Sequence, residues 1–429
     1  MDNDDPFLDP RTKGLPATAG AIRLSDIGRR GWNLLREDLP LPVAVLRTSA
    51  LDANSAWMRQ FVTLTGARLA PHGKTTMSPE LFARQMADGA WGLTVATVQQ
   101  MRVARRAGIE RIIIANELIG PREIDEVLDE LAADVRFDLY CLVDSVEGVR
   151  RLTQAASARP LGRPIGVLVE IGYAGGRAGC RDVDQALAVA RAARSAGPYL
   201  AVRGVEGFEG LHQSLPGAEG VAQVTRFLET IVEVARQADS EGLFASDEIL
   251  LSAGGSAYYD LVAEIFGAVR LSRPTVIVLR SGCYLIHDAG LYSRSFSELR
   301  KRSEAARGLA GGFENALEVW AYVLSIPEPQ RAIVGAGRRD FGHDAGPPTA
   351  LKSFRPGRDG APTELVGSWE IVGVNDQHAH LVFPKGADLA VGDMVALGVR
   401  HPCTTFDRWR LIYQVADDYT VTSAIQTCF

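Results

Sequence analysis

The chain has 429 residues, which is long enough for two domains or for one large barrel with a smaller domain attached. Hydrophobic residues make up 46% of it, charged residues 23%, and the formal net charge is −6. This composition excludes a disordered chain and a basic nucleic-acid-binding protein, and no stretch approaches the 18 or so uninterrupted apolar residues of a membrane span.

The N-terminal segment MDNDDPFLDPRTKG is acidic and lacks the apolar core of a secretory signal, so we expect a cytoplasmic protein. The cysteines are odd in number and form no CxxC pair, which predicts reduced thiols rather than a disulfide framework. They are Cys141, Cys180, Cys283, Cys403 and Cys428.

Short β-rich apolar runs alternate with longer amphipathic stretches between about residues 67 and 285. Eight runs have this character: ARLAPHGK, WGLTVAT, RIIIANEL, FDLYCLVD, IGVLVEIG, LAVRGVEGF, EILLSAGG and PTVIVLRSG. Strands that alternate with helices pair in parallel, and eight such units in this length fit a closed barrel. The predicted fold class is therefore α/β, a (β/α)8 TIM-type barrel, with a doubly wound open sheet as the alternative.

After about residue 310 the sequence changes to short strand-like runs separated by Pro, Gly, Asp and Asn, which predicts an all-β domain. The run PVAVLRTS near residue 42 would pair with this domain or cap the barrel, and residues 338–364 read as a Gly/Pro-rich loop. We therefore expect an N-terminal extension at 1–40, a barrel at 41–305 and a β-strand domain at 306–429.

PHGK ends the first predicted barrel strand and would place the Lys74 amine, beside His72, at the face where the strand ends meet. A partly desolvated lysine has a lowered pKa, and its neutral amine can form a Schiff base with an aldehyde. Taken alone, a solvated surface lysine is the simpler interpretation.

Glycine-rich segments follow the last two predicted barrel strands, SAGGSAYYD at 252–260 and RSGCYLIHD at 280–288. In TIM-type barrels this region often binds phosphate through backbone amides, although ordinary turns use the same residues. A Schiff-base lysine opposite an anion cradle is the layout that pyridoxal phosphate (PLP) requires. Arg177, in the loop EIGYAGGRAG, would hydrogen-bond the cofactor ring or a substrate carboxylate.

A second cluster lies near the C-terminus, where His401 and Cys403 flank one proline in GVRHPCTTFDRW. Imidazole nitrogen and soft thiolate favour zinc, and two protein ligands leave positions open for a substrate oxygen. A loop histidine and a buried cysteine would explain the same spacing without a metal. His378 and His380 are better explained as structural residues, and His212 is a candidate pocket residue.

The segment PHGKTTMSPELFARQMADGAWGLTVAT resembles the PLP-lysine motif of the D-serine dehydratase and D-threonine aldolase family, within the alanine-racemase-like (fold type III) enzymes. The similarity continues through IIIANELI, EIGYAGGRAG, SAGGSAYYD and HPCTTFDRW, and covers most of residues 40–429. The lysine motif and the His-x-Cys pair are specific in combination.

The resemblance implies that Lys74 carries PLP, with His72 beside it and Arg177 near the ring. It also implies that His401 and Cys403 bind zinc, and that a homodimer forms in which the β-domain of one subunit completes the site on the barrel of the other. The segments that it assigns to the cofactor phosphate contain Gly254, Gly255, Ser256, Gly282, Cys283 and Tyr284. Loop 338–364 and the segment GFEGLHQ depart from the family pattern, which bears on the substrate pocket.

The expected reaction is elimination of water from a D-3-hydroxy amino acid, with D-serine as the first candidate substrate. The alternatives are retro-aldol cleavage of the D-threonine aldolase type and dehydration of D-threo-3-hydroxyaspartate. Relatives with aldolase activity look like His-x-Asp, so Cys403 favours elimination. A PLP-binding protein without turnover resembles the barrel alone, whereas this chain also has a β-domain.

Overall fold

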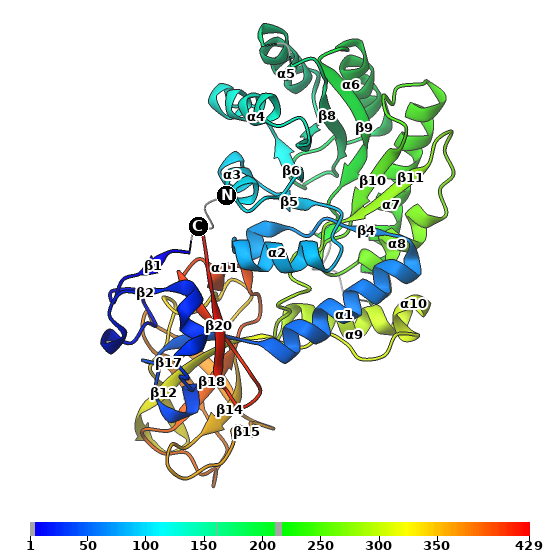
Figure 1. Cartoon of the computed structure of the whole chain (residues 1–429). Coiled ribbons are helices and arrows are strands. Elements are labelled where there is room, and N and C mark those ends of the chain that lie inside the picture. The colour runs from blue at the N-terminus through cyan, green and yellow to red at the C-terminus, as the bar shows by residue number, and fades with distance from the viewer. Residues whose placement is uncertain (1–4, 160, 211–216) are drawn as a thin grey trace.

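The structure, a computed structural model, describes residues 5–159, 161–210 and 217–429. Figure 1 shows an α/β part and a β-rich part, with helix α1 (Thr48–Thr65) running between them. None of the described helices is both long enough and apolar enough to cross a membrane.

Eight parallel strands form the sheet of the α/β part, in the order β4-β11-β10-β9-β8-β7-β6-β5. A bridge between His72 and Thr94 links the two ends of this sheet, so the barrel is nearly closed. The prediction of a TIM-type barrel is confirmed, and each of the eight apolar runs contains one strand. The strands are β4 (Arg68–Leu69), β5 (Leu93–Val95), β6 (Arg111–Glu117), β7 (Asp138–Val143), β8 (Ile165–Ile171), β9 (Leu200–Gly207), β10 (Ile249–Ala253) and β11 (Thr275–Leu279).

Helices follow the barrel strands and cover the outside of the sheet (Figure 1). Several begin at a residue whose side chain accepts a backbone N–H, for example Thr97, Ser145 and Asp182, which is the preferred chemistry of a helix start. The helices are α2 (Pro79–Ala87), α3 (Val98–Arg106), α4 (Pro121–Ala133), α5 (Val146–Ala158), α6 (Val183–Ser195), α7 (Gly217–Ser240), α8 (Tyr259–Gly267), α9 (Leu291–Arg302) and α10 (Glu304–Arg307).

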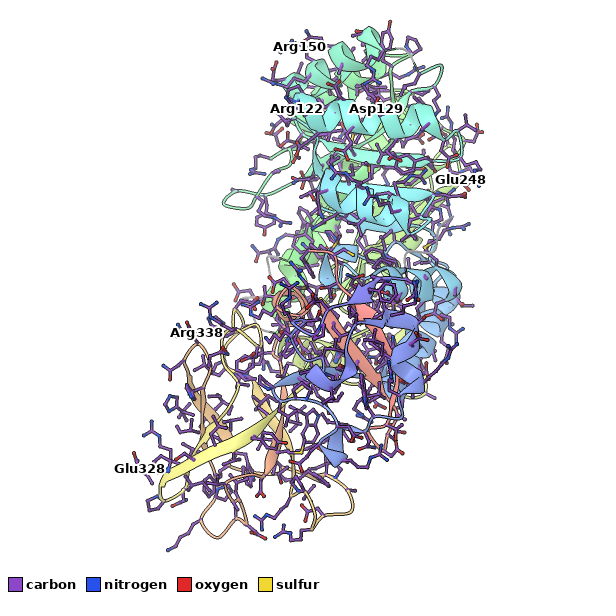
Figure 2. All side chains as sticks on the ribbon, turned by 60° about the vertical axis from the view of Figure 1, so that its left-hand side comes forward. Arg122, Asp129, Arg150, Glu248, Glu328 and Arg338 are labelled. Carbon is purple, nitrogen blue, oxygen red and sulfur yellow. The ribbon has the colours of Figure 1, made fainter. Side chains whose placement is uncertain are left out.

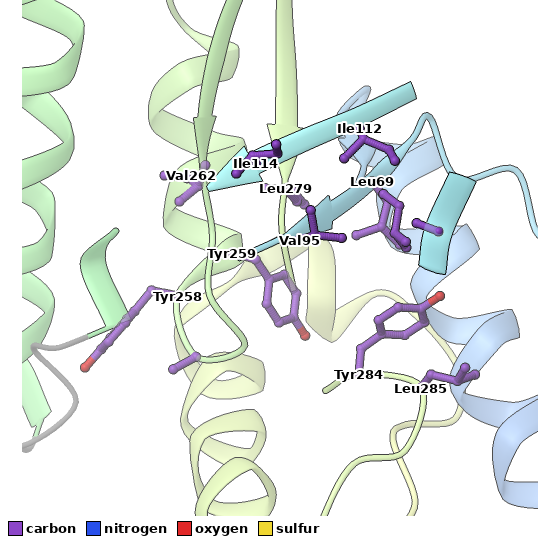
Figure 3. Packing of buried hydrophobic residues seen from close by; sticks show 14 of the residues in the cluster. Leu69, Val95, Ile112, Ile114, Tyr258, Tyr259, Val262, Leu279, Tyr284 and Leu285 are labelled. Atoms are coloured by element: carbon purple, nitrogen blue, oxygen red, sulfur yellow. The ribbon is translucent and has the colours of Figure 1, made fainter. Parts of the chain in front are cut away.

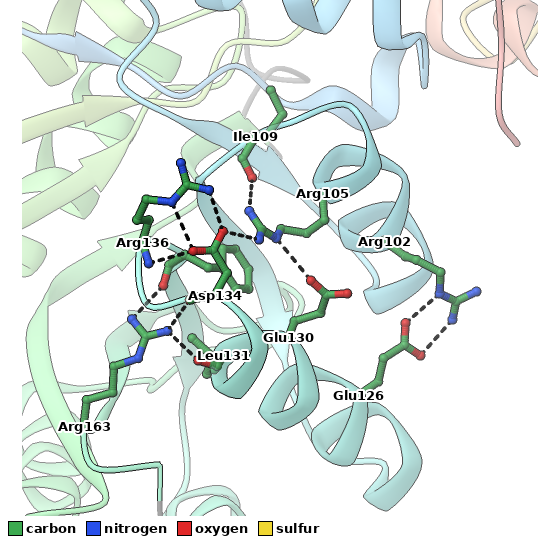
Figure 4. Close-up of polar contacts among 10 residues, drawn as sticks. Arg102, Arg105, Ile109, Glu126, Glu130, Leu131, Asp134, Arg136 and Arg163 are labelled. Carbon is green, nitrogen blue, oxygen red and sulfur yellow. Dashed lines mark hydrogen bonds and ion pairs between the residues drawn. The ribbon is translucent and has the colours of Figure 1, made fainter. Parts of the chain in front are cut away.

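Ion pairs connect neighbouring helices on the barrel surface (Figure 4). Arg102 of α3 contacts Glu126 of α4 at 2.6 Å, and Arg105 contacts Glu130 at 3.2 Å and Asp134 at 3.0 Å. Other charged side chains, including Arg122 and Arg150, project from these outer helices (Figure 2). The Arg102–Glu126 pair is largely exposed, and such a pair stabilises by only about 0–1 kcal/mol, whereas the Arg105 side chain is mostly buried between its two partners.

The barrel core is a continuous apolar cluster in which strand and helix side chains interdigitate (Figure 3). Leu69, Val95 and Leu279 are among its members. The rings of Tyr258, Tyr259 and Tyr284 belong to the same cluster, so these tyrosines are core residues. The strands of a barrel are buried on both faces, which explains why they appear in the sequence as near-continuous apolar runs.

The β-rich part contains a sheet in the order β15-β14-β18-β12-β13-β17-β16, to which β3, β19 and β20 are attached. Strand β3 pairs with β12 and β19, so the run near residue 42 lies in this sheet rather than in the barrel. The strands are β3 (Val43–Arg47), β12 (Leu317–Glu328), β13 (Arg331–Val334), β14 (Thr349–Phe354), β15 (Thr363–Glu364), β16 (Glu370–Val374), β17 (Ala379–Val382), β18 (Met394–Gly398), β19 (Leu411–Val415) and β20 (Val421–Gln426).

The N-terminal segment packs on the β-rich part. It contains strands β1 (Phe7–Leu8) and β2 (Ile22–Arg23) and the short 3-10 helices η1 (Ala17–Ala19), η2 (Leu24–Arg29) and η3 (Leu34–Arg36). Ile27 and Leu34 join Trp320 and Tyr413 in a second apolar cluster. Residues 5–40 are therefore part of the packing of this domain.

Segment 338–364, predicted as a loop, contains β14 and β15. Strand β14 pairs with β18, and the ammonium of Lys352 contacts the Glu318 carboxylate at 2.8 Å. Gly and Pro residues on both sides of the run TALKSF conceal its alternation in the sequence. The part of this segment before β14 is irregular and reaches toward the barrel mouth through Asp344.

Candidate active site

Lys74 lies in a 3-10 turn, η4 (Gly73–Thr75), directly after the first barrel strand. Its side chain is exposed at the mouth of the barrel. The surrounding protein lowers the pKa of the amine by partial desolvation; the sulfur atoms of Cys403 and Cys283 oppose this effect, and the guanidinium groups of Arg177 and Arg280 add to it. An accessible amine with a lowered pKa is what condensation with an aldehyde requires.

His72 lies two residues before Lys74, and its Nδ1 atom is buried without a hydrogen-bond partner among the described residues. Burial holds the pKa of the imidazole well below its usual value, and the positive charge of Lys74 lowers it further. His72 is therefore neutral near pH 7. A buried polar atom without a partner indicates a position for a ligand or a water molecule.

The predicted metal pair meets the turn that carries Lys74. Helix α11 (Cys403–Phe406) places the Cys403 sulfur 3.6 Å from the hydroxyl of Thr75, the residue after Lys74. The Cys403 sulfur also lies 3.5 Å from the sulfur of Cys283. Ligand atoms of Cys283, His401 and Cys403 all lie within 4.8 Å of one another. Segments that are 328 residues apart in the sequence thus meet at the barrel mouth.

Asp344 orients His401. The Nδ1 atom of His401 lies 2.5 Å from one carboxylate oxygen of Asp344, and the other oxygen accepts a hydrogen bond from the Thr404 hydroxyl at 2.8 Å. A histidine that ligates a metal commonly donates its other ring N–H to a carboxylate in this way, leaving the second nitrogen for the ion. Asp344 comes from the segment whose role the sequence left open.

The charges of the metal pair are complementary. A hydrogen bond with Cys283 lowers the pKa of the Cys403 thiol well below its usual value, and the contact with His401 adds to this effect. Burial alone would lower the pKa of His401, but the contacts with Cys403 and Asp344 raise it to about 9. Cys403 is therefore a thiolate next to an imidazolium, and a metal ion would replace the proton of the imidazolium.

The backbone amides predicted to bind phosphate are divided between two roles. The amides of Gly254 and Gly255 donate to the buried Glu209 carboxylate, at 3.0 and 2.6 Å. The amides of Ser256, Gly282 and Cys283 have no hydrogen-bond partner among the described residues. The latter three amides are therefore the ones that remain available to an incoming anion, because the first two already donate to Glu209.

Gly282 is required by close packing. A Cβ atom at this position would lie 2.5 Å from the backbone oxygen of His72 and 2.7 Å from the Thr75 hydroxyl. The absence of a side chain allows the end of β11 to approach η4, which brings Cys283 next to Thr75. The Tyr284 ring is buried in the core, so only its backbone is available to a ligand.

Arg177 is exposed at the mouth, with its guanidinium 4.8 Å from the centre of the Phe208 ring. This position agrees with a role in binding a cofactor ring or a carboxylate. A second arginine, Arg280, was not singled out from the sequence. It is buried at the end of β11, with an ion pair of 2.6 Å to Glu206 and a hydrogen bond of 2.7 Å to the carbonyl of Gly207.

Buried carboxyl groups lie at the ends of the neighbouring strands. Burial raises the pKa of Glu170 to about 10, and a hydrogen bond with Glu117 adds to the shift, so Glu170 is protonated near pH 7. Glu117, Asp144 and Glu170 also have oxygens within 4.8 Å of one another. A glutamate at the end of each of β6, β8 and β9 was a signal in the sequence that could have revealed this group.

Of the remaining candidate histidines, two lie in or next to strand β17 and one lies outside the described residues. His378 is exposed, and the ring of His380 in β17 lies 2.8 Å from the side-chain oxygen of Asn375. His212 lies outside the described residues. At the end of β6, the side chain of Asn116 donates to the carbonyl of Ala96 at 3.3 Å.

Comparison with known families identifies both parts of the chain. The model of the alanine racemase N-terminal domain matches residues 46–270, and that of a putative serine dehydratase domain matches residues 316–415. The chain belongs to the alanine-racemase-like family. Members of this family, which have fold type III, depend on PLP.

Relatives match over nearly the whole chain. D-threonine aldolase of Arthrobacter sp is 29% identical over 387 residues, which are 90% of this chain and 91% of the relative. D-threo-3-hydroxyaspartate dehydratase of Delftia sp. strain HT23 is 27% identical, with coverages of 89% and 96%. The crystal structure of D-threonine aldolase from Filomicrobium marinum superposes with a TM-score of 0.74 at 24% identity, covering 92% of this chain and 97% of that one. The homologues are enzymes, and the fold of the chain is theirs.

The residues at the barrel mouth fit PLP and a soft metal ion. An accessible lysine of lowered pKa, together with three amides and a His72 nitrogen that have no partner among the described residues, matches an aldehyde, a phosphate and a polar ring. Thiolate and imidazole with their atoms within 4.8 Å match zinc in donor type. The cofactor and the metal ion would lie on the same side of the barrel, because Thr75, the residue after Lys74, contacts the sulfurs of Cys403 and Cys283.

Proposed function

We propose that this chain is a PLP-dependent, zinc-assisted dehydratase that removes water from a D-3-hydroxy amino acid such as D-serine, yielding a 2-oxo acid and ammonia. The contact of Thr75 with the sulfurs of Cys403 and Cys283, at 3.6 and 3.8 Å, carries the proposal. Thr75 directly follows Lys74, so this contact places the proposed metal site next to the proposed cofactor lysine. Elimination of hydroxide, a poor leaving group, requires a base and a Lewis acid that act on the same substrate.

Lys74 is the base that removes the proton from the substrate Cα. Its lowered pKa leaves a larger fraction of the amine neutral near pH 7 than an ordinary lysine would have. PLP, when bound, supplies an electron sink for the charge that remains at Cα. Arg177, which is exposed at the mouth, is our candidate for the substrate carboxylate or the cofactor ring.

His401 and Cys403 hold the zinc ion, and Asp344 fixes the ring of His401 through the 2.5 Å contact. Zinc, when bound, supplies a Lewis acid for the 3-hydroxyl group, so that hydroxide leaves with its charge partly neutralised. A thiolate ligand favours zinc over the harder magnesium and manganese ions. Cys403 is therefore the residue that supports elimination over cleavage of the Cα–Cβ bond.

The cations of segment 338–364 bear on the substrate side chain. Lys352 pairs with Glu318 at 2.8 Å, Arg355 with Asp393 at 2.6 Å and Arg339 with Asp376 at 3.6 Å. Arg338 lies on the β-rich part (Figure 2). Because three of these cations already neutralise other carboxylates, they do not support binding of the second carboxylate of 3-hydroxyaspartate. This favours a substrate with a neutral side chain, such as D-serine.

Retro-aldol cleavage is the second candidate, and the similarity to D-threonine aldolase over 90% of the chain favours it. The two reactions share the lysine and the cofactor and differ in the bond that breaks.

We further propose a cytoplasmic homodimer with shared active sites. Since η4 and α11 meet within one chain, a second subunit would contribute to the substrate side of the pocket.

A substrate screen tests the proposal. The purified protein, loaded with PLP and zinc, is given D-serine, D-threonine and the 3-hydroxyaspartate isomers, and ammonia and aldehyde are both measured. We expect ammonia and pyruvate from D-serine. Aldehyde without ammonia would establish the aldolase instead, and absence of any product despite bound PLP would favour a binding protein without turnover.

A further inference from the structure

The cluster at the barrel mouth contains one more sulfur than the His-x-Cys pair supplies. Cys283 lies at the end of β11, in a segment expected to bind phosphate, yet its sulfur is 3.5 Å from that of Cys403 and 3.8 Å from the Thr75 hydroxyl. We propose that Cys283 is a third ligand, so that the zinc site is Cys2His with one open position. This inference rests on the proposed zinc site and specifies its ligands.

The distance between the two sulfurs agrees with a shared ion. Two thiolates at about 2.3 Å from one tetrahedral zinc ion are separated by about 3.8 Å. A disulfide would require about 2.05 Å between the sulfurs. The observed 3.5 Å is close to the first value and far from the second, so a small adjustment would allow both sulfurs to bind one ion.

The backbone around Cys283 supports a fixed ligand. Gly282 packs so closely on His72 and Thr75 that a Cβ atom would be only 2.5 Å from the His72 carbonyl oxygen. The Cys283 carbonyl accepts a hydrogen bond of 2.7 Å from the His287 amide, and its side chain is 5% exposed. A buried sulfur on a constrained backbone loses little conformational entropy when it binds a metal.

The third ligand changes the chemistry of the site. Two thiolates and one neutral imidazole balance the charge of zinc and leave the fourth tetrahedral position for a substrate oxygen, as in catalytic sites that keep one position open. Cys283 belongs to the barrel and Cys403 to the β-rich part, so the ion would also connect the two. The backbone amide of Cys283 stays available to a phosphate, because only the side chain is used for zinc.

X-ray absorption at the zinc edge of the wild-type protein, loaded with PLP and one equivalent of zinc, tests the proposal without a mutation. We expect two sulfur neighbours at about 2.3 Å. Cys283→Ser should retain one sulfur and weaken zinc binding at least about tenfold, the lower limit for loss of an outer-shell partner. Cys428→Ser is the matched control, because its thiol lies outside the cluster. The PLP absorbance of each variant reports whether it has folded.

One sulfur neighbour in the wild-type protein, with unchanged zinc affinity in Cys283→Ser, would overturn the assignment. The proposed function would survive that result if the protein still eliminated water and Cys403→Ser abolished zinc binding. A wild-type protein that binds no zinc, yet turns over D-serine, would overturn both the third ligand and the proposed role of the metal. Two sulfur neighbours of zinc in the wild-type protein and in Cys428→Ser, with only one in Cys283→Ser and in Cys403→Ser, would establish Cys283 as the third ligand.

Discussion

Asp344 gives the sharpest test of the metal site, because it touches a proposed ligand and would not touch the ion. Its carboxylate lies 2.5 Å from Nδ1 of His401 and accepts from the Thr404 hydroxyl at 2.8 Å. Asp344→Asn keeps the shape of the side chain but removes the negative charge and one of the two acceptor oxygens. The amide oxygen can still accept from His401 and the amide NH2 can donate to the Thr404 hydroxyl, so the main change is that the hydrogen bond to His401 loses its charged acceptor.

The expected loss follows from the kind of hydrogen bond. A hydrogen bond to a charged group contributes about 1.5–3 kcal/mol, against about 1 kcal/mol for a neutral one. The Asp344 side chain is 45% exposed, so screening by solvent reduces the difference. We expect a loss of about 1–2 kcal/mol, or about 5- to 30-fold in zinc affinity, near the range measured for carboxylates behind zinc-bound histidines.

Competition with a chromogenic chelator near neutral pH measures the zinc dissociation constant of each variant. Asp407→Asn is the matched control, because this carboxylate lies in the segment that carries His401 and Cys403 but pairs with Arg408 at 2.6 Å. The control should bind zinc as the wild type does. An equal zinc affinity in Asp344→Asn and the wild type would refute the role of Asp344, and with it the assignment of His401 as a ligand oriented by a carboxylate.

Three further outcomes are expected. Lys74→Ala should lose the visible absorbance that PLP acquires when bound to a lysine, and survival of the band would contradict the assignment of Lys74. Chelation of the metal should stop the proposed elimination while the PLP absorbance remains; activity that persists after verified removal of zinc would contradict the metal's role. The third concerns Glu170, whose pKa burial raises to about 10 by disfavouring the charged form, so the stability of the fold should fall as pH rises from about 4.5 toward 10. Glu170→Gln should make the free energy of unfolding depend less steeply on pH, by up to about 1.4 kcal/mol per pH unit, as measured by urea unfolding between pH 4.5 and about 10. The same dependence on pH in the variant and the wild type would show that Glu170 does not titrate in this range.

The barrel was predictable because its strands are buried on both faces and its helices are amphipathic. Runs such as RIIIANEL and IGVLVEIG have no polar alternation, and the eightfold repetition of strand and helix limits the topology. The β-rich part was also visible as a change in pattern. Strand β14 was not, because Gly and Pro residues surround a run of only six residues.

The candidate site was predictable only where residue type and local spacing carry the chemistry. Lys74 and the His401–Cys403 pair have this property. Asp344 and Arg280 do not: an aspartate in an irregular segment and an arginine at a strand end are common, and their roles depend on contacts with distant residues. Asp344 is 57 residues from His401, and Arg280 is 74 residues from Glu206, at separations that no local pattern reveals.

The proposed base and the proposed metal ligands meet at the contact between the barrel and the β-rich part. Thr75 follows Lys74 directly, and its hydroxyl contacts a sulfur from each part of the molecule, at 3.8 Å for Cys283 and 3.6 Å for Cys403. In the proposed elimination, the base and the Lewis acid must act on adjacent carbons of one substrate. A displacement of α11 relative to η4 would separate these groups before it disturbed the fold of either part. The packing between the two parts is therefore a requirement of the chemistry itself, and substitutions at that boundary should reduce turnover more than they reduce stability.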